Sequence, residues 1–281
     1  MPPRGDGARA RPTMSTARSL EAPAQALVDD VMNKALGNLR RLQAERGSWP
    51  GDYGGPMFLL PMYVALAWTA KRLPAADRVA RIILYFSNVQ RADGSIGLHA
   101  ESTEGSMFTT ALSYVAMRLL GLPAADERLM RMRGWIEANG SPLGAASWGK
   151  FTLCLLGLYE WEGIHPLPPE LWLLPKEAPM HPRRLWCHAR QVYLPMAWLY
   201  GVRAKVGQEP ILEQLREELY AGRYASIDWA KQRSTVARAD DYRPASKALD
   251  AANVAQLLIE RLPKRTLRQR ALDECLEHIR Y

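Results

Sequence analysis

Two short segments, QAERGSW (residues 43–49) and QRADGSI (residues 90–96), decide the fold. Each places a glutamine four residues before a glycine, at the expected end of a helix. The glycine can adopt the left-handed conformation that ends a helix, and the glutamine amide can bond the backbone groups exposed there. Trp49 can lie over the first joint. Ile96 stands at the matching position of the second copy, so we expect that corner to be held more loosely.

Apolar and amphipathic helices are expected to alternate after the first corner. Residues 57–73, 107–120 and 148–161 are nearly apolar all round and predict buried helices, whereas residues 75–90 and 124–138 are amphipathic. Such alternation is typical of an inner and an outer ring, because only the inner ring is shielded on every side. Corners spaced by roughly fifty residues indicate a repeat of helical hairpins. The sequence therefore predicts an all-α fold, an α/α barrel (toroid).

Two further features define the domain organisation. Residues 1–22 are rich in Arg, Pro, Gly and Ser, which predicts a disordered tail, and residues 23–281 are expected to form one barrel domain. Additional helices are expected over residues 23–45, 211–220, 245–261 and 266–281, and an aromatic helix is expected to begin near Arg183. The last helix reaches the end of the sequence without a capping residue.

Composition limits the classes of function. Hydrophobic residues make up 48% of the 281 residues, but no stretch approaches the ~20 apolar residues that a membrane-spanning helix needs. The formal charge of +8 suits nucleic acid, an anionic membrane surface, or neither of them. The arginines are dispersed and no nucleic-acid motif accompanies them, so we expect no nucleic-acid partner. Cys154, Cys187 and Cys275 lie in helical patterns and predict reduced thiols of a cytosolic protein.

The segment HPRRLWCHARQVYLPMAWLYG (residues 181–201) gathers tryptophan and tyrosine rings beside a cysteine and a histidine. It is too aromatic for a solvent-facing helix and too polar in its first two turns for a plain core. One chemical use is the wall of an apolar cavity whose ring faces stabilise positive charge. Trp186 and His188 are two residues apart, so on a helix they share a cavity only if it wraps round the helix start. The alternative is a packed tryptophan and a buried, hydrogen-bonded histidine.

This segment resembles one from the oxidosqualene cyclases, the lanosterol and cycloartenol synthase branch of the terpene cyclase/mutase family. Further resemblance, in the family's order, lies in GDYGGPMFLLP (51–61), SWGKF (147–151), ELWLLP (170–175) and ASIDWAKQR (225–233). It runs from about residue 36 to the end and covers only the N-terminal part of such an enzyme. The resemblance implies that the corners are the family's QW-type elements and that the barrel is incomplete relative to the family's two barrels.

The resemblance also implies which residues line the substrate cavity. They are Tyr53, near the second ring of the folded substrate, Trp148, and the pair Trp186 and His188, near the late side-chain cation. Tyr53 sits among glycines that let backbone approach closely. The alternatives are a surface turn tyrosine for Tyr53 and a core tryptophan for Trp148. We expect a hollow bordered by all four residues.

Ala189 and Tyr193 lie four residues apart and share a helix face. The resemblance places them at the constriction through which substrate enters. The family often has cysteine at the first of these positions. Ala189 departs from that pattern, but its side chain is also small. Simple helix packing is the alternative explanation for the pair.

The general acid of the family is missing. Opening an epoxide needs a strong acid in a dry site, and the resemblance implies an Asp-Cys-Thr-Ala-Glu motif, or Asp-x-Asp-Asp in squalene-hopene cyclases. Neither occurs. The acidic doublets at residues 29–30 and 240–241 are expected on an amphipathic helix and in a polar turn, as solvated carboxylates without a raised pKa. The histidines and cysteines lack zinc-ligand spacing, so we expect no metal and no cofactor.

Three functions stay open. In the first, the chain is the N-terminal domain of an oxidosqualene-cyclase-type isomerase whose acid half is missing, because it is encoded separately or has been lost. In the second, the chain is a non-catalytic isoprenoid-lipid-binding barrel or an inactive truncated paralogue. In the third, it is an unrelated α/α scaffold. We expect no turnover by this chain alone, because cavity walls without a proton donor lower no barrier to epoxide opening. Its activity as an enzyme would depend on a partner.

The first function implies a partner and a location. The ligand would be a C30 isoprenoid, 2,3-oxidosqualene or squalene, and the protein would be cytoplasmic and bound monotopically to one membrane leaflet. Arg183, Arg184 and Arg190 flank the aromatic helix and suit such an interface. The alternative is a buried helix with solvated arginines.

Overall fold

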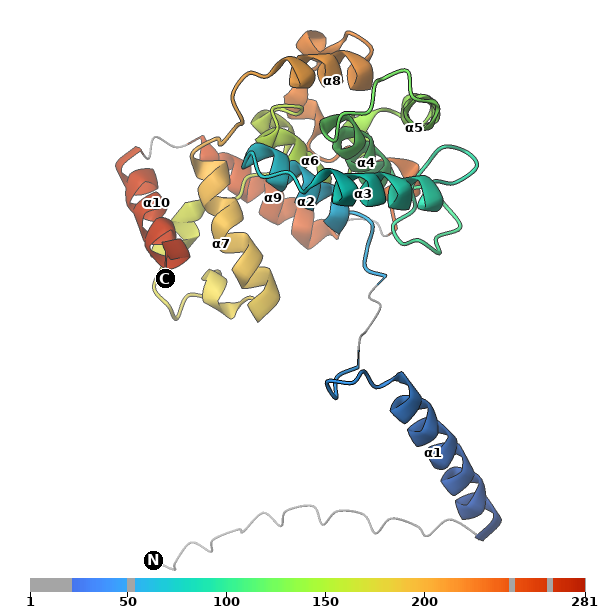
Figure 1. The fold of residues 1–281 in the computed structure, drawn as a ribbon. Coiled ribbons are helices and arrows are strands. Elements are labelled where there is room, and N and C mark those ends of the chain that lie inside the picture. The colour runs from blue at the N-terminus through green and yellow to red at the C-terminus, as the bar shows by residue number, and fades with distance from the viewer. Residues whose placement is uncertain (1–21, 50–53, 243–245, 262–264, 281) are drawn as a thin grey trace, which may run out of the picture. The chain divides into compact units, whose positions relative to one another are not determined.

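The structure, a computed structural model, describes residues 22–49, 54–242, 246–261 and 265–280. They belong to two compact units, Met1–Tyr53 and Gly54–Tyr281, each of which is described by itself. All regular elements in the described residues are helices, as the sequence predicts (Figure 1). The predicted tail, apart from Ala22, and the predicted cavity residue Tyr53 lie outside the described residues. The boundary predicted between tail and barrel stays a prediction.

The first unit contains α1 (Ala22–Leu42) and the corner that follows it. Gly47 has a φ of +79°, and the Gln43 side-chain amide donates a 2.8 Å hydrogen bond to its carbonyl oxygen. The indole N–H of Trp49 donates to the carbonyl oxygen of Leu39 at 2.7 Å. The ring therefore lies over the end of the helix and closes the joint, as expected.

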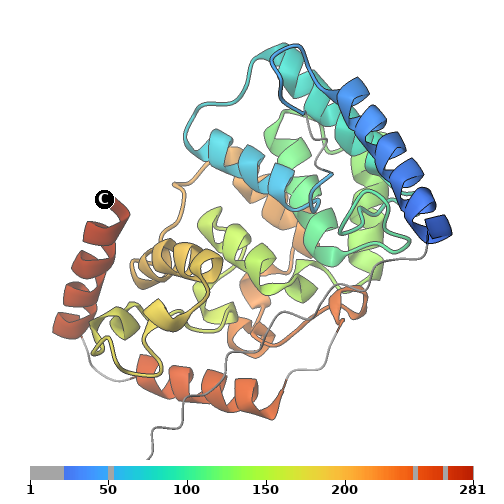
Figure 2. The same ribbon diagram turned by 90° about the horizontal axis from the view of Figure 1, so that it is seen from below.

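The second unit is built round α4 (Met107–Leu119), every residue of which is buried. Four helices pack against it: α2 (Leu59–Thr69), α5 (Glu127–Ala138), α6 (Ser147–Leu155) and α8 (Pro210–Tyr220). α3 (Ala76–Val89) is amphipathic and buries Ile82 and Phe86 in the same core. Figures 1 and 2 show α4 enclosed by these neighbours. The burial predicted for residues 107–120 is confirmed for 107–119, and Leu120 is partly buried.

The predicted burial of the first apolar helix is wrong for one of its faces. Val64 of α2 is fully buried, but Leu66 is 67% exposed and Tyr63 is also exposed. Only one side of α2 packs on α4. The other side borders an open apolar groove, so a uniformly apolar sequence does not mean that the helix is enclosed.

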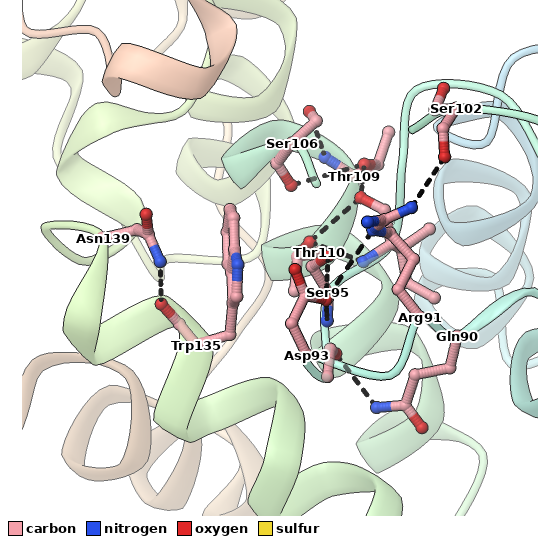
Figure 3. Close-up of polar contacts among 12 residues, drawn as sticks. Gln90, Arg91, Asp93, Ser95, Ser102, Ser106, Thr109, Thr110, Trp135 and Asn139 are labelled. Atoms are coloured by element: carbon pink, nitrogen blue, oxygen red, sulfur yellow. Dashed lines mark hydrogen bonds and ion pairs between the residues drawn. The ribbon is translucent and has the colours of Figure 1, made fainter. Parts of the chain in front are cut away.

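Polar contacts hold the second corner firmly (Figure 3), although it has Ile96 where the first corner has Trp49. Gly94 has a φ of +91°, and the Gln90 amide donates to its carbonyl oxygen at 3.0 Å and to that of Arg128 in α5 at 2.9 Å. Ile96 is fully buried, and its backbone N–H and C=O both bond side chains of α4. The expectation of a loose corner is therefore wrong. Contacts with α4 and α5 supply the support.

The C-terminal half carries α7 (Cys187–Gly201), α9 (Lys247–Glu260) and α10 (Arg265–Arg280). α7 begins four residues later than predicted, because a 3-10 turn, Pro182–Arg184, and an extended Leu185 and Trp186 precede it. α10 packs on α7 and on the 3-10 turn Pro169–Leu173 (Figure 2). The Arg268 guanidinium bridges Glu170 in that turn and Glu260 at the end of α9.

The other short 3-10 turns are Pro142–Gly144, Trp161–Gly163, Tyr224–Ser226, Trp229–Gln232 and Arg238–Asp240. They shape the connections around α6 and between α8 and α9. Two of them, Trp161–Gly163 and Trp229–Gln232, pack against each other. Together they close the core at the C-terminal end of α6.

Candidate functional site

Trp186 and His188 meet at the start of α7. Trp186 is the residue before the first turn, with φ −53° and ψ 143°, so it does not follow the helical spacing. Its ring centroid lies 4.4 Å from that of His188, and the Cys187 thiol lies 3.2 Å from His188 Nδ1. Trp186 is 72% exposed and His188 is exposed as well. The two rings form one exposed pair, and the burial that a packed-core explanation requires is absent.

Trp148 lies elsewhere, at the start of α6. It is 42% exposed, and its ring meets the edge of Phe58, which stacks on Phe108 of α4 with centroids 5.0 Å apart. Trp148 borders a pocket of about 330 Å³ whose lining does not include Trp186 or His188. The structure thus pairs two of the four cavity residues and places Trp148 apart. Their common hollow stays a prediction.

The predicted entrance residues differ in environment. Ala189 is exposed, whereas Tyr193 is partly buried and donates a 3.0 Å hydrogen bond to the carbonyl oxygen of Pro168. Burial raises the pKa of the Tyr193 phenol, so it stays a neutral donor. The Trp172 ring lies 6.4 Å away. Tyr193 therefore ties α7 to the proline-rich turn, and the entrance role of the pair stays a prediction.

An apolar groove that the sequence analysis missed runs between α2, α6 and the end of α7. Its volume is about 560 Å³, and it is lined by Met62, Tyr63, Leu66, Leu155, Leu199 and Val206, among others. Lys205, at its rim, pairs with Glu160. The only sequence signal was the run of apolar residues in α2, which is also what a buried helix would show.

The pocket beside Trp148 is more polar, and we name it the basic pocket. It is lined by Trp148 and Lys150 of α6, His165, Arg233 and α9 residues that include Asn253. The Lys150 ammonium is buried and donates to the carbonyl oxygens of residues 232 and 235 at 2.6 and 2.7 Å. Burial lowers the pKa of Lys150 to about 8. A lysine within an otherwise apolar helical segment was the sequence signal for this pocket.

Asp240 corrects the prediction of solvated acidic doublets. Only 9% of Asp240 is exposed, and its carboxylate accepts a 2.8 Å hydrogen bond from the backbone N–H of Phe108, in the first turn of α4. Burial raises its pKa, although hydrogen bonds from Ser106 and the backbone oppose the shift. Asp29 and Asp30 on α1 are exposed as predicted. Only the folded chain brings Asp240 to a helix 132 residues away.

Other classes of site receive little support from the described residues. Among them, no cluster of three or more His, Cys, Asp or Glu side chains could hold a metal ion. All three cysteines are free thiols, and only Cys187 is exposed. No helix within the described part of the chain has the length and apolar character to cross a bilayer.

Comparison with known proteins gives the family. A family model described as the squalene-hopene cyclase N-terminal domain matches residues 32–281. The chain is 46% identical over 239 residues to a lanosterol synthase from Homo sapiens, and 38% identical over 251 residues to a cycloartenol synthase from Dictyostelium discoideum. An alpha-onocerin synthase from Lycopodium clavatum is 40% identical over 272 residues.

These matches cover 85%, 89% and 90% of this chain, but only 32%, 36% and 35% of the three relatives. The chain thus spans about a third of their length. The all-helical fold agrees with this assignment, and the resemblance inferred from five sequence segments is confirmed. The chain belongs to the squalene-hopene cyclase N-terminal domain family and is similar to the N-terminal part of the lanosterol and cycloartenol synthases.

Proposed function

We propose that this chain acts as the N-terminal domain of an oxidosqualene-cyclase-type triterpene cyclase. One observation carries the proposal: the family match over residues 32–281, with relatives named lanosterol synthase and cycloartenol synthase. In this role the chain supplies aromatic wall and entrance for 2,3-oxidosqualene. The two glutamine-glycine corners act as the family's repeat elements and keep the helices in place.

The exposed pair of Trp186 and His188 supports a role in which another surface completes the cavity. The two ring centroids lie 4.4 Å apart at the start of the helix, and Trp186 is 72% exposed. The rings therefore have free faces that could border a hollow. Ring faces stabilise carbocations through their quadrupole. Trp148 and Tyr53 would add further rings when the complementary part of a cyclase is present.

The general acid would come from that complementary part. Asp240 is the one buried aspartate with a raised pKa in the described residues, but it already accepts the N–H of Phe108 and holds the first turn of α4. An acid used as a helix cap is not aimed at a substrate. We therefore expect that the chain needs a second polypeptide, or a C-terminal continuation, for turnover.

The test is conversion of 2,3-oxidosqualene, measured by gas chromatography, with this chain alone and with the C-terminal part of a cyclase added. We expect product only with both. In the complemented reaction, Trp186→Ala should lower kcat, whereas Tyr242→Ala, at an aromatic side chain that is 71% exposed and is not a predicted cavity residue, should leave it within about twofold. Conversion by the chain alone would refute the assignment of the acid.

A second candidate is a non-catalytic isoprenoid-lipid-binding domain. The groove of about 560 Å³ beside α2 favours it, because its lining is almost wholly apolar. Squalene binding by the isolated chain tests this candidate. Leu66→Glu should abolish binding, while Leu84→Glu, at an exposed leucine of α3 outside the groove, should not. Retained binding in Leu66→Glu would exclude the groove.

We also propose that the protein is cytoplasmic and associates with one membrane leaflet. The exposed segment before α7 supports the membrane contact, because Leu185 lies beside Arg183, Arg184 and Arg190, all of them exposed, next to the aromatic pair. Such a surface combines interfacial aromatic and basic residues. Sedimentation with liposomes tests it: Leu185→Asp, at a residue outside the predicted cavity, should reduce the bound fraction, and equal binding by wild type and variant would count against this surface.

A further inference from the structure

Apolar and polar side chains both line the basic pocket. The apolar ones include Trp148 and Phe151 of α6 and Met196 of α7. The polar ones include His165, Arg233 and the amides of α9. A pocket with an apolar wall and a few convergent polar groups is the usual form of a small-molecule site.

The cations of this pocket lack a counter-ion. Lys150 is 2% exposed and bonds only backbone carbonyl oxygens, and Arg233 donates from Nη1 to the carbonyl oxygen of Ala230. In the part of the chain that the structure describes, neither pairs with a carboxylate. Asp250, on α9, lines an adjoining pocket with His165 and Arg233, and its charge raises the pKa of His165 against the larger effects of burial and of the two cations. Lys150 is buried and Arg233 is half-buried, and no carboxylate among the described residues bonds either of them, so an anion entering the pocket would be attracted by both charges.

Two hydrogen-bonding atoms of the His165 and Arg233 side chains are unused within the described part of the chain, but solvent does not reach them, so they do not face the pocket. The buried Nδ1 of His165 and Nε of Arg233 have no partner among the described residues. His165 Nε2 lies 3.2 Å from the Ser234 hydroxyl, which leaves Nδ1 as the free ring nitrogen. Burial, then the charges of Lys150 and Arg233, lower the pKa of His165, so the three basic groups lie close enough to act on one another.

We propose that the basic pocket binds a carboxylate with a hydrocarbon body, such as a fatty acid. The carboxylate accepts hydrogen bonds from the terminal nitrogens of the Arg233 guanidinium, and Asn253 and Gln256 on α9 offer further amide donors. The hydrocarbon lies against Trp148, Phe151 and Met196. This site is separate from the apolar groove. It shares Trp148 with the proposed cyclase cavity, but its ligand is an anion and no reaction is involved, so binding tests it independently of the cyclase role.

The experiment compares ligands of equal length that differ in the head group. Binding of laurate and of dodecanol to the full chain is measured by displacement of cis-parinaric acid, below the critical micelle concentration. We expect laurate to bind at least about tenfold more tightly, since a hydrogen bond to a charged group outweighs a neutral one. Arg233→Gln should lower laurate affinity at least about tenfold and leave dodecanol affinity unchanged.

The matched control is Arg238→Gln, which removes an exposed arginine five positions along that does not line the pocket. It should bind laurate as the wild type does. Equal binding of laurate and dodecanol by the wild type would overturn the proposal, and so would unchanged laurate binding by a folded Arg233→Gln protein. If that variant unfolds, the comparison of the two ligands on the wild type decides alone. Failure here leaves the cyclase proposal standing, because conversion of 2,3-oxidosqualene tests that independently.

Discussion

The ion pair between α4 and α8 offers the sharpest test of how this fold is held. Arg118 and Glu218 have side chains 8% and 11% exposed, and the guanidinium meets the carboxylate through Nε at 2.9 Å and Nη2 at 2.8 Å. Arg118 Nη1 also donates to the carbonyl oxygen of Leu122 at 2.6 Å, and the Tyr114 hydroxyl donates to Glu218 at 2.7 Å. The carboxylate therefore satisfies two buried partners at once.

Replacing Glu218 by leucine should lower the free energy of unfolding by about 3–5 kcal/mol, because it leaves the Arg118 guanidinium buried without its counter-ion. The Tyr114 hydroxyl loses its acceptor as well, which costs about 1–3 kcal/mol if no water replaces it. We expect the double variant Arg118→Met/Glu218→Leu to be more stable than Glu218→Leu alone, since removing both charges also removes the unpaired one.

The assay is urea unfolding followed by circular dichroism, arranged as a double-mutant cycle. Asp77→Ala is the control, because its pair with Arg81 on α3 has side chains 71% and 72% exposed and should be worth about 0.5 kcal/mol or less. A loss below about 1 kcal/mol in Glu218→Leu, or strictly additive effects in the cycle, would refute the view that this pair joins α4 to α8.

Three further outcomes follow from single residues. Burial lowers the pKa of Lys150 to about 8, so above that pH the unfolded chain binds more protons than the folded chain does. The stability of the wild type should therefore rise between pH 8 and 9, and that of Lys150→Met should not. Thermal unfolding measures both. Burial raises the pKa of Asp240, so its contribution to the free energy of unfolding is favourable at low pH and is lost as the pH rises. Between pH 4 and pH 7, Asp240→Asn should therefore gain stability relative to the wild type. A stability difference between the two proteins that does not change with pH would contradict this. Gln90→Ala should lower the free energy of unfolding by about 1–2 kcal/mol, because the Gln90 amide donates hydrogen bonds both to Gly94 and to α5. An unchanged urea midpoint would show that these hydrogen bonds do not stabilise the corner.

The helices could be predicted because periodicity is a local property of the chain. The helix predicted over residues 107–120 appears as α4, and both corners show the glutamine-to-glycine bond that their spacing suggested. What periodicity could not predict is which side of an apolar helix is covered. Leu66 and Val64 sit in one apolar run, yet one is 67% exposed and the other is buried.

The candidate site was less predictable, since its residues act through contacts between distant segments. Trp186 and His188 looked incompatible with a shared face until the helix was seen to begin after Trp186. A boundary that moves by a few residues changes which side chains meet. The basic pocket was missed because Lys150, His165 and Arg233 come from three segments, and nothing local joins them.

Asp240 shows how such a distant contact reaches the aromatic residues of the site. Its carboxylate holds the backbone N–H of Phe108, Phe108 stacks on Phe58 with centroids 5.0 Å apart, and Phe58 meets Trp148 edge to face at 5.8 Å. The α4 terminus thus positions a ring that in turn supports Trp148. If Trp148 borders a cyclase cavity, Asp240 orients that wall without touching substrate, which gives a buried carboxylate a use other than acid catalysis.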